Sequence, residues 1–172
     1  ARRLGATPLV ADLTRVETLS PALEGCDAVV FAAGSKGKDL DNVDRDGAIS
    51  LADSCGPAGV RRFIMLSSFF AGRPDDGPER IRAYLRAKQA ADEHLLATGL
   101  DVTIVRPGWL TNEEETGRIV AAAVLNDAEA SISRADVAAT LVTALELPAT
   151  IGRAFEIASG STPIAEALAG LR

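Results

Sequence analysis

The sequence is poor in the residue types that several common functions require. Aromatic residues make up only 4% of the 172 residues, which disfavours a stacking surface for single-stranded nucleic acid. The net charge of −6 has the wrong sign for binding phosphate backbones. The longest uncharged stretch, from Phe63 to Gly72, is too short to span a bilayer. We therefore expect neither nucleic acid nor a membrane as a partner.

Cysteine and histidine are also scarce. Cys26 and Cys55 are the only cysteines and lack CxxC spacing, so we expect buried thiols rather than a disulfide framework. The single histidine, His94, disfavours a histidine-based metal site, and its helical position predicts a solvated surface residue. No basic start followed by an apolar core marks a secretory signal. A cytoplasmic, metal-free protein is expected.

What the sequence does contain is an alternation of short apolar strands with helical segments. The predicted strands are Leu9–Ala11, Ala28–Ala32, Arg62–Leu66, Val102–Val105 and Ala154–Ile157. The predicted helices are Val16–Leu23, Leu40–Ala58, Pro78–Thr98 and Ala135–Leu147. Three of the strands are nearly continuous apolar runs, as expected for a parallel sheet covered on both faces. The fold class is therefore α/β, a doubly wound parallel sheet in three αβα layers, in one domain over 1–172.

Glycines and one short motif mark the helix ends. Gly25, Gly59 and Gly99 each follow a predicted helix, where a left-handed cap favours glycine. The segment Ser133–Asp136 resembles a capping box that begins the last long helix.

The front of the chain departs from a complete βαβ start. Residues 1–5 have the pattern of a helix end capped by glycine, and no GxGxxG or GxxGxxG motif occurs anywhere. The glycine-rich segment Gly34–Lys38 lacks P-loop spacing and is expected to be a solvated loop after a strand. We expect a domain that is truncated at its N-terminus, without the first strand, glycine loop and first helix.

The chemistry-bearing residues follow two of the predicted strands. Ser67 and Ser68 come directly after a strand, at the edge where open parallel sheets bind ligands. Tyr84 and Lys88 are four residues apart and share one helix face with an apolar stripe. In a reductase, such a tyrosine would protonate a carbonyl, the ammonium would lower the tyrosine pKa, and a serine would stabilise the oxyanion. Alternatively, Lys88 forms a helical ion pair with Asp92, and Tyr84 is a packing residue.

Several segments together resemble the atypical short-chain dehydrogenase/reductases. They resemble most the NAD(P)H-binding, NmrA-like and biliverdin/flavin-reductase-like branch, over essentially the whole chain. The segments are 12–14, 23–30, 60–68, 84–92, 99–108 and 132–138. The resemblance implies a Rossmann-like fold.

The resemblance also implies roles for individual residues. Ser68, Tyr84 and Lys88 match the catalytic Ser/Thr, Tyr and Lys. The positions that match cofactor contacts are Asp12, Leu13, Ala32, Ala33, Gly34, Ser67, Lys88, Pro107 and Gly108. Three of these assignments have a purely structural alternative. Asp12 could cap a turn, Ala32–Gly34 could be small for packing alone, and Pro107 could simply end a strand.

The implied activity is hydride transfer between NADPH or NADH, with NADP favoured, and a small carbonyl, quinone or flavin-like acceptor. The alternative is a non-catalytic NAD(P)-binding sensor, as in the regulatory members of that branch. A monomer or weak homodimer is expected. Departures from the family bear on these roles: the phosphate-binding loop is missing, Asp44 replaces a usual asparagine, and the tyrosine is often dispensable in this branch. Trp109 is either a pocket-lining residue or a core anchor.

Overall fold

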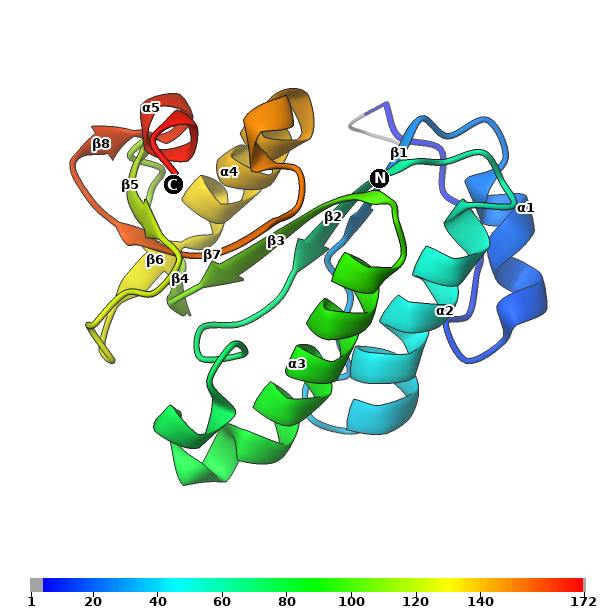
Figure 1. The fold of residues 1–172 in the computed structure, drawn as a ribbon, viewed down its shortest axis with the longest axis horizontal. Coiled ribbons are helices and arrows are strands. Elements are labelled where there is room, and N and C mark those ends of the chain that lie inside the picture. Colours follow the sequence, from blue (N-terminus) through cyan, green and yellow to red (C-terminus); the bar gives the residue numbers. More distant parts are fainter. Residues whose placement is uncertain (1–4, 172) are drawn as a thin grey trace.

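The computed structural model describes residues 5–171, which form a six-stranded sheet with helices on both faces (Figure 1). The strands are β1 (Ala28–Phe31), β2 (Arg62–Leu66), β3 (Asp101–Pro107), β4 (Trp109–Thr111), β5 (Arg118–Ala122), β6 (Ser131–Ser133), β7 (Arg153–Ser159) and β8 (Thr162–Pro163). The α-helices are α1 (Leu19–Leu23), α2 (Asp46–Cys55), α3 (Arg82–Ala97), α4 (Arg134–Glu146) and α5 (Ile164–Ala169). Shorter turns are the 3-10 segments η2 (Val16–Thr18), η4 (Pro74–Asp76), η5 (Glu79–Ile81) and η6 (Pro148–Thr150), and the π-helical turn η3 (Leu40–Arg45).

The main sheet has the order β1-β2-β3-β7-β5-β8. β1, β2, β3 and β7 are parallel, and β5 runs antiparallel to both β7 and β8. β4 and β6 pair in a separate two-stranded ribbon. The predicted α/β class with a mostly parallel, Rossmann-like sheet is confirmed. None of the helices in the described residues has the length and apolar content needed to cross a bilayer.

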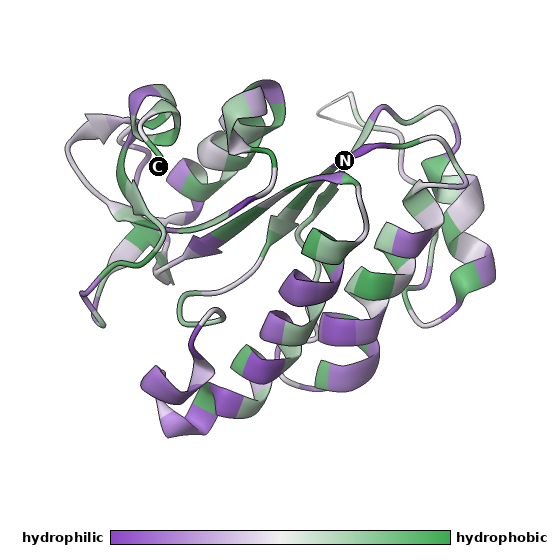
Figure 2. Cartoon of the chain, in the orientation of Figure 1, coloured by the Kyte–Doolittle hydropathy of each residue, from purple (hydrophilic) through white to green (hydrophobic). Residues whose placement is uncertain are grey.

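The central strands separate two hydrophobic cores. Phe63 and Met65 of β2 pack with α2 and α3, whereas Ile64 between them packs with α4 and α5. This period-2 alternation follows from strand geometry, and both faces are apolar because helices cover both. In Figure 2 the central strands are coloured hydrophobic along most of their length, while α3 carries hydrophilic residues over much of its surface.

Two predictions about individual segments are wrong. Leu9–Ala11 is not a strand, because no described strand lies beside it to accept its hydrogen bonds, and Val10 is 102% exposed. Cys26 is exposed in the turn after α1, whereas Cys55 is buried as expected. Burial raises the pKa of the Cys55 thiol to about 11, so this thiol is protonated and unreactive. The helix end expected over residues 1–4 lies outside the described residues.

The expected helix caps are confirmed. Gly25, Gly59 and Gly99 adopt φ values of +71°, +78° and +73°, in the left-handed region. The Ser133 hydroxyl is the N-cap of α4 and accepts a 3.0 Å hydrogen bond from the Asp136 backbone N–H. The Asp136 carboxylate also accepts hydrogen bonds from the backbone N–H groups of Thr116 and Gly117, so it ties α4 to the segment before β5.

A buried ion pair fixes the loop after β2 against β7. Glu156 of β7 is 0% exposed and accepts a 2.6 Å hydrogen bond from the Arg73 guanidinium. The same carboxylate accepts hydrogen bonds from the backbone N–H groups of Phe70 (3.2 Å) and Leu125 (2.7 Å). Three donors from two loops therefore converge on one carboxylate. They supply the ion pair and the hydrogen bonds that a buried charge needs to be stable.

We predict that Glu156→Ala lowers the free energy of unfolding by about 3 kcal/mol, because Arg73 and two backbone N–H groups lose their acceptor. The measurement is urea denaturation followed by circular dichroism. Asp75→Ala is the control: it breaks the exposed Arg86–Asp75 pair, which is worth at most about 1 kcal/mol. Equal losses for the two variants would contradict this assignment.

Candidate functional site

The candidate site lies where the parallel strands end. The Phe31–Met65 and Leu66–Val105 pairs show that β1, β2 and β3 run in register to the same edge of the sheet. The segments that follow these strands therefore meet: Ala32–Gly34 after β1 and the two serines after β2, beside Pro107 at the end of β3.

A cavity of about 590 Å³ opens at this edge. Its lining includes seven of the eleven residues predicted from the sequence: Ala32, Ala33, Gly34, Ser67, Tyr84, Lys88 and Pro107. Ser68 and Gly108 line a smaller adjoining cavity of about 40 Å³, which shares Ile81 and Pro107 with the first. Asp12 and Leu13 are not among the residues that line either cavity.

Lys88 is a buried charged group at the cavity wall. Its side chain is 2% exposed, and its Nζ donates a 3.1 Å hydrogen bond to the Leu66 carbonyl. The ammonium lies 5.7 Å from the centre of the Phe31 ring. No described carboxylate lies within salt-bridge distance of it, so the alternative of a Lys88–Asp92 ion pair is wrong. Burial lowers the pKa of Lys88, as expected for an ammonium without a direct counter-ion.

Tyr84 points into the same cavity from α3. Burial raises the pKa of Tyr84, and the negative charge of Asp44 acts in the same direction. Hydrogen bonding with the Ser68 side chain opposes this increase. The lowering of the tyrosine pKa expected from the Lys88 ammonium is not found, because burial and the charge of Asp44 set the direction of the shift. Tyr84 is therefore a protonated phenol at neutral pH, suited to donate a proton.

Asp92 holds Ser67 rather than Lys88. The Asp92 carboxylate is 1% exposed, and its Oδ2 accepts hydrogen bonds from the Ser67 hydroxyl (2.9 Å) and the Arg106 guanidinium (2.9 and 3.0 Å). Arg106 outcompetes Lys88 because its forked donors reach from β3 onto the same oxygen. The network fixes Ser67 at the cavity wall.

The remaining predicted contacts have local structural roles. Asp12 is exposed and accepts hydrogen bonds from the backbone N–H and the hydroxyl of Thr14, which is the turn-capping geometry weighed as its alternative. Leu13 packs against the core beneath α2. At Gly108, a Cβ would lie 2.3 Å from the Ala130 carbonyl oxygen, so only glycine allows this close backbone approach.

Four charged cavity residues were not predicted to belong to the site: Lys36, Asp44, Arg80 and Arg134. Asp44 of η3 is 1% exposed and accepts hydrogen bonds from the Ser35 hydroxyl and backbone N–H. Arg80 of η5 and Arg134 of α4 also line the cavity. Two signals were available in the sequence: Arg80 lies four residues before Tyr84, and Asp44 stands where the related proteins usually have an asparagine. Trp109 is 39% exposed, contacts Arg80 and lines the smaller cavity, so it is a pocket residue rather than a core anchor.

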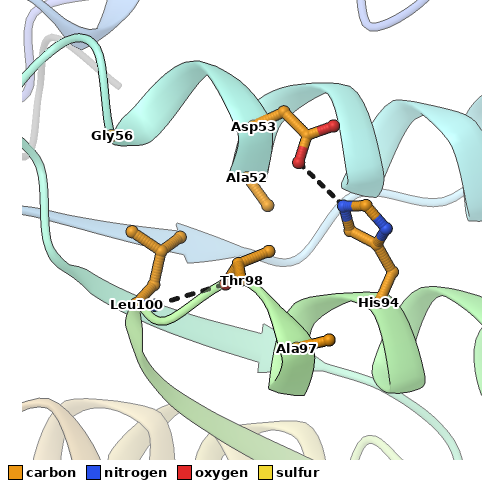
Figure 3. A pocket seen from close by; sticks show the side chains of 7 residues that line it. All are labelled: Ala52, Asp53, Gly56, His94, Ala97, Thr98 and Leu100. Carbon is orange, nitrogen blue, oxygen red and sulfur yellow. Dashed lines mark hydrogen bonds and ion pairs between the residues drawn. The ribbon is translucent and has the colours of Figure 1, made fainter.

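A separate hollow of about 280 Å³ lies between α2 and α3 (Figure 3). His94 from α3 and Asp53 from α2 point toward one another across it, with Nε2 and Oδ1 2.7 Å apart. Both side chains are partly exposed, which confirms His94 as a surface residue. The described residues contain no group of three or more His, Cys, Asp or Glu side chains that could hold a metal ion.

The main cavity fits one part of a nicotinamide dinucleotide. The residues after β1 are small and exposed, which leaves space above the strand end. Lys88 has donor capacity beyond its one hydrogen bond, and sugar hydroxyls are acceptors for it. The glycine-rich cradle for the pyrophosphate is not present in the sequence. The residues present therefore fit the nicotinamide and ribose part.

Comparison with known proteins identifies the family of the chain. A profile described as NAD(P)H-binding matches residues 1–148. The chain is 43% identical over 169 residues to a Bacillus subtilis protein named "uncharacterized sugar epimerase YhfK", covering 95% of this chain and 78% of that protein. A solved structure from Bacillus halodurans, provisionally named an NAD-dependent epimerase/dehydratase, superimposes with a TM-score of 0.88 at 41% identity, covering 93% of this chain and 76% of that one.

The oxidoreductase ylbE from Lactococcus lactis superimposes with a TM-score of 0.83 at 36% identity, covering 93% of this chain and 74% of that one. The fold and the cavity thus define a Rossmann-like α/β protein of the dinucleotide-binding class. The chain belongs to the NAD(P)H-binding family.

We predict that Lys88→Met raises the free energy of unfolding near neutral pH by about 1–2 kcal/mol when no ligand is bound, because it removes a buried ammonium without a direct counter-ion. Burial lowers the pKa of Lys88 in the folded protein. As the pH rises from that pKa toward the ordinary value of 10.5, the buried Lys88 loses its proton and the wild type regains the lost stability. The gain should therefore shrink at alkaline pH.

The measurement is urea denaturation of both proteins across this pH range. Lys38→Met is the matched control, because Lys38 is exposed and its replacement should change stability by less than about 0.5 kcal/mol. Destabilisation by Lys88→Met at neutral pH would show that the ammonium has a structural role.

Proposed function

We propose that the protein is an NAD(P)H-dependent oxidoreductase that reduces a small carbonyl, quinone or flavin-like acceptor. The observation that carries this proposal is the convergence of Tyr84, Lys88 and the two serines on the cavity edge of the parallel sheet. Membership of the NAD(P)H-binding family supports it. NADPH is the nucleotide to test first, with NADH beside it.

Tyr84 is the proposed proton donor. Its phenol retains its proton at neutral pH, because burial and the nearby Asp44 both raise its pKa. In the reduction of a carbonyl, the carbon gains a hydride and the oxygen takes the Tyr84 proton, which gives an alcohol. A reduced nicotinamide supplies the hydride when it is bound. The Ser68 hydroxyl, beside Tyr84, is placed to donate a hydrogen bond to the same oxygen.

Lys88 is proposed to hold the nucleotide ribose and to return a proton to Tyr84. Its ammonium is buried, and its pKa is lowered by that burial, which makes it a better proton donor than an exposed lysine. Ser67, held by Asp92, and the small residues Ala32–Gly34 would form the wall along which the nucleotide lies. Pro107 would close this wall at the end of β3.

A non-catalytic NAD(P)-binding module is the second candidate. The observation that favours it is that Lys88 and the small residues Ala32–Gly34 line the cavity, and a nucleotide could bind them whether or not Tyr84 transfers a proton. A binding module predicts nucleotide binding by calorimetry without turnover of any acceptor.

We predict that Tyr84→Phe lowers the rate of acceptor-dependent NADPH oxidation by about 10²–10⁴-fold, because the proton donor is lost while the ring still packs. As the pH rises, activity should fall first with the deprotonation of Lys88, whose pKa is lowered, and only then with that of Tyr84, whose pKa is raised. The measurement is NADPH absorbance with a panel of carbonyls, quinones and flavins.

The control variant is His94→Gln, which changes the exposed pair in the separate hollow and should leave the rate unchanged. Calorimetric NADPH binding by Tyr84→Phe verifies that the cavity is intact. An unchanged rate in Tyr84→Phe removes Tyr84 from the mechanism, and nucleotide binding without wild-type turnover selects the binding module.

A further inference from the structure

The cavity concentrates positive charge in an acidic protein. The chain carries a net charge of −6, yet the charged residues that line the cavity are four cations and one carboxylate. They are Lys36, Arg80, Lys88, Arg134 and Asp44. A concave site of one sign in a chain of the opposite sign raises the local concentration of ligands with the complementary charge.

The single carboxylate does not neutralise the cations directly. Asp44 is 1% exposed, and its oxygens accept hydrogen bonds from Ser35. Among the described residues, no carboxylate lies within 4.0 Å of Arg80 or Arg134. Most of the donor capacity of these two guanidinium groups is therefore available to a ligand.

Arg80 and Arg134 are each oriented by one neighbour. The Arg80 guanidinium lies over the Trp109 ring, 5.6 Å from its centre. Arg134, at the start of α4, donates a 3.1 Å hydrogen bond from Nε to the side-chain oxygen of Asn112. Both contacts restrict the side chain without using its charge, so less rotamer freedom is lost when an anion binds.

Both arginines adjoin the β4–β6 ribbon: Arg80 lies over the Trp109 ring of β4, and Arg134 follows Ser133, which pairs with Thr111 of β4. Arg80 directly precedes Ile81, which the main cavity shares with the smaller cavity beside Ser68 and Trp109. The small residues Ala32–Gly34, proposed to face the nucleotide, come from the end of β1. Arg80 and Arg134 come from the segments after β2 and β6, which form the wall of the proposed acceptor side.

We infer that the acceptor carries an anionic group, a carboxylate or a phosphate, which Arg80 and Arg134 bind while its reducible group lies next to Tyr84. This inference rests on the proposed function and adds the substrate class to it. Arginine forks match the planar carboxylate and the phosphate oxygens, and such charge-assisted hydrogen bonds are stronger than neutral ones. An anion in this position orients the acceptor and leaves Tyr84 free for proton transfer.

The test compares two flavins with the same ring: FMN, which carries a phosphate, and riboflavin, which does not. Binding is followed by flavin fluorescence anisotropy without any nucleotide. We expect the wild type to bind FMN at least about tenfold more tightly than riboflavin, with the ratio falling at high salt. In the double variant Arg80→Gln/Arg134→Gln the two flavins should bind equally.

Arg86→Gln is the matched control, because it removes one positive charge from the exposed face of α3, outside the cavity. It should keep the FMN preference. Equal binding of the two flavins by the wild type, or no binding of FMN, overturns the inference. Weaker NADPH binding by the double variant with an unchanged flavin ratio would assign the arginines to the nucleotide and also overturn it.

The outcomes separate this inference from the proposed function. NADPH oxidation at equal rates and equal affinities with both flavins supports the oxidoreductase and overturns the anion site. Preferential FMN binding that depends on both arginines, without NADPH oxidation by any acceptor, supports the anion site and overturns the oxidoreductase.

Discussion

Burial of the central strands on both faces is the constraint on which the site depends. Phe63, Ile64 and Met65 of β2 contribute to two opposite cores in alternation, so a shift by one residue would exchange the cores. The register of β2 with β3 is therefore fixed, and so is the point at which both strands end. Because the ends coincide, the backbone that follows each strand reaches the same edge and forms the cavity there.

The parts of this arrangement that depend on local sequence could be predicted. The apolar run of Arg62–Leu66 gave a strand with the observed bounds, because a strand covered on both faces leaves a continuous apolar signal. Gly25 and Ser133 were recognisable as caps since their conformations depend on neighbouring residues alone. The convergence of Tyr84 and Lys88 on the serines also followed, because helix spacing and the parallel sheet edge together determine it.

The parts that depend on distant partners could not be predicted. Leu9–Ala11 has the composition of a strand, but a strand forms only where another accepts its hydrogen bonds. Asp92 was paired with Lys88 by helix spacing, whereas Arg106 on β3 reaches it in space. Arg134 is 46 residues after Lys88 in the chain and carries no local motif that marks it as a cavity residue. Loop packing brings it there.

The electrostatics of the cavity argue that it was not arranged for stability. The one carboxylate on α3 that could neutralise Lys88 is already bound by Arg106 and Ser67, so the ammonium stays buried beside a backbone carbonyl and an aromatic ring. A methionine in place of Lys88 would avoid the cost of burying that ammonium. An acidic partner for Arg80 would likewise neutralise the guanidinium charge. Such an unfavourable electrostatic arrangement is retained where a bound ligand compensates its cost. The unpaired cations and the protonated Tyr84 together therefore indicate a cavity whose electrostatic balance is completed by what it binds.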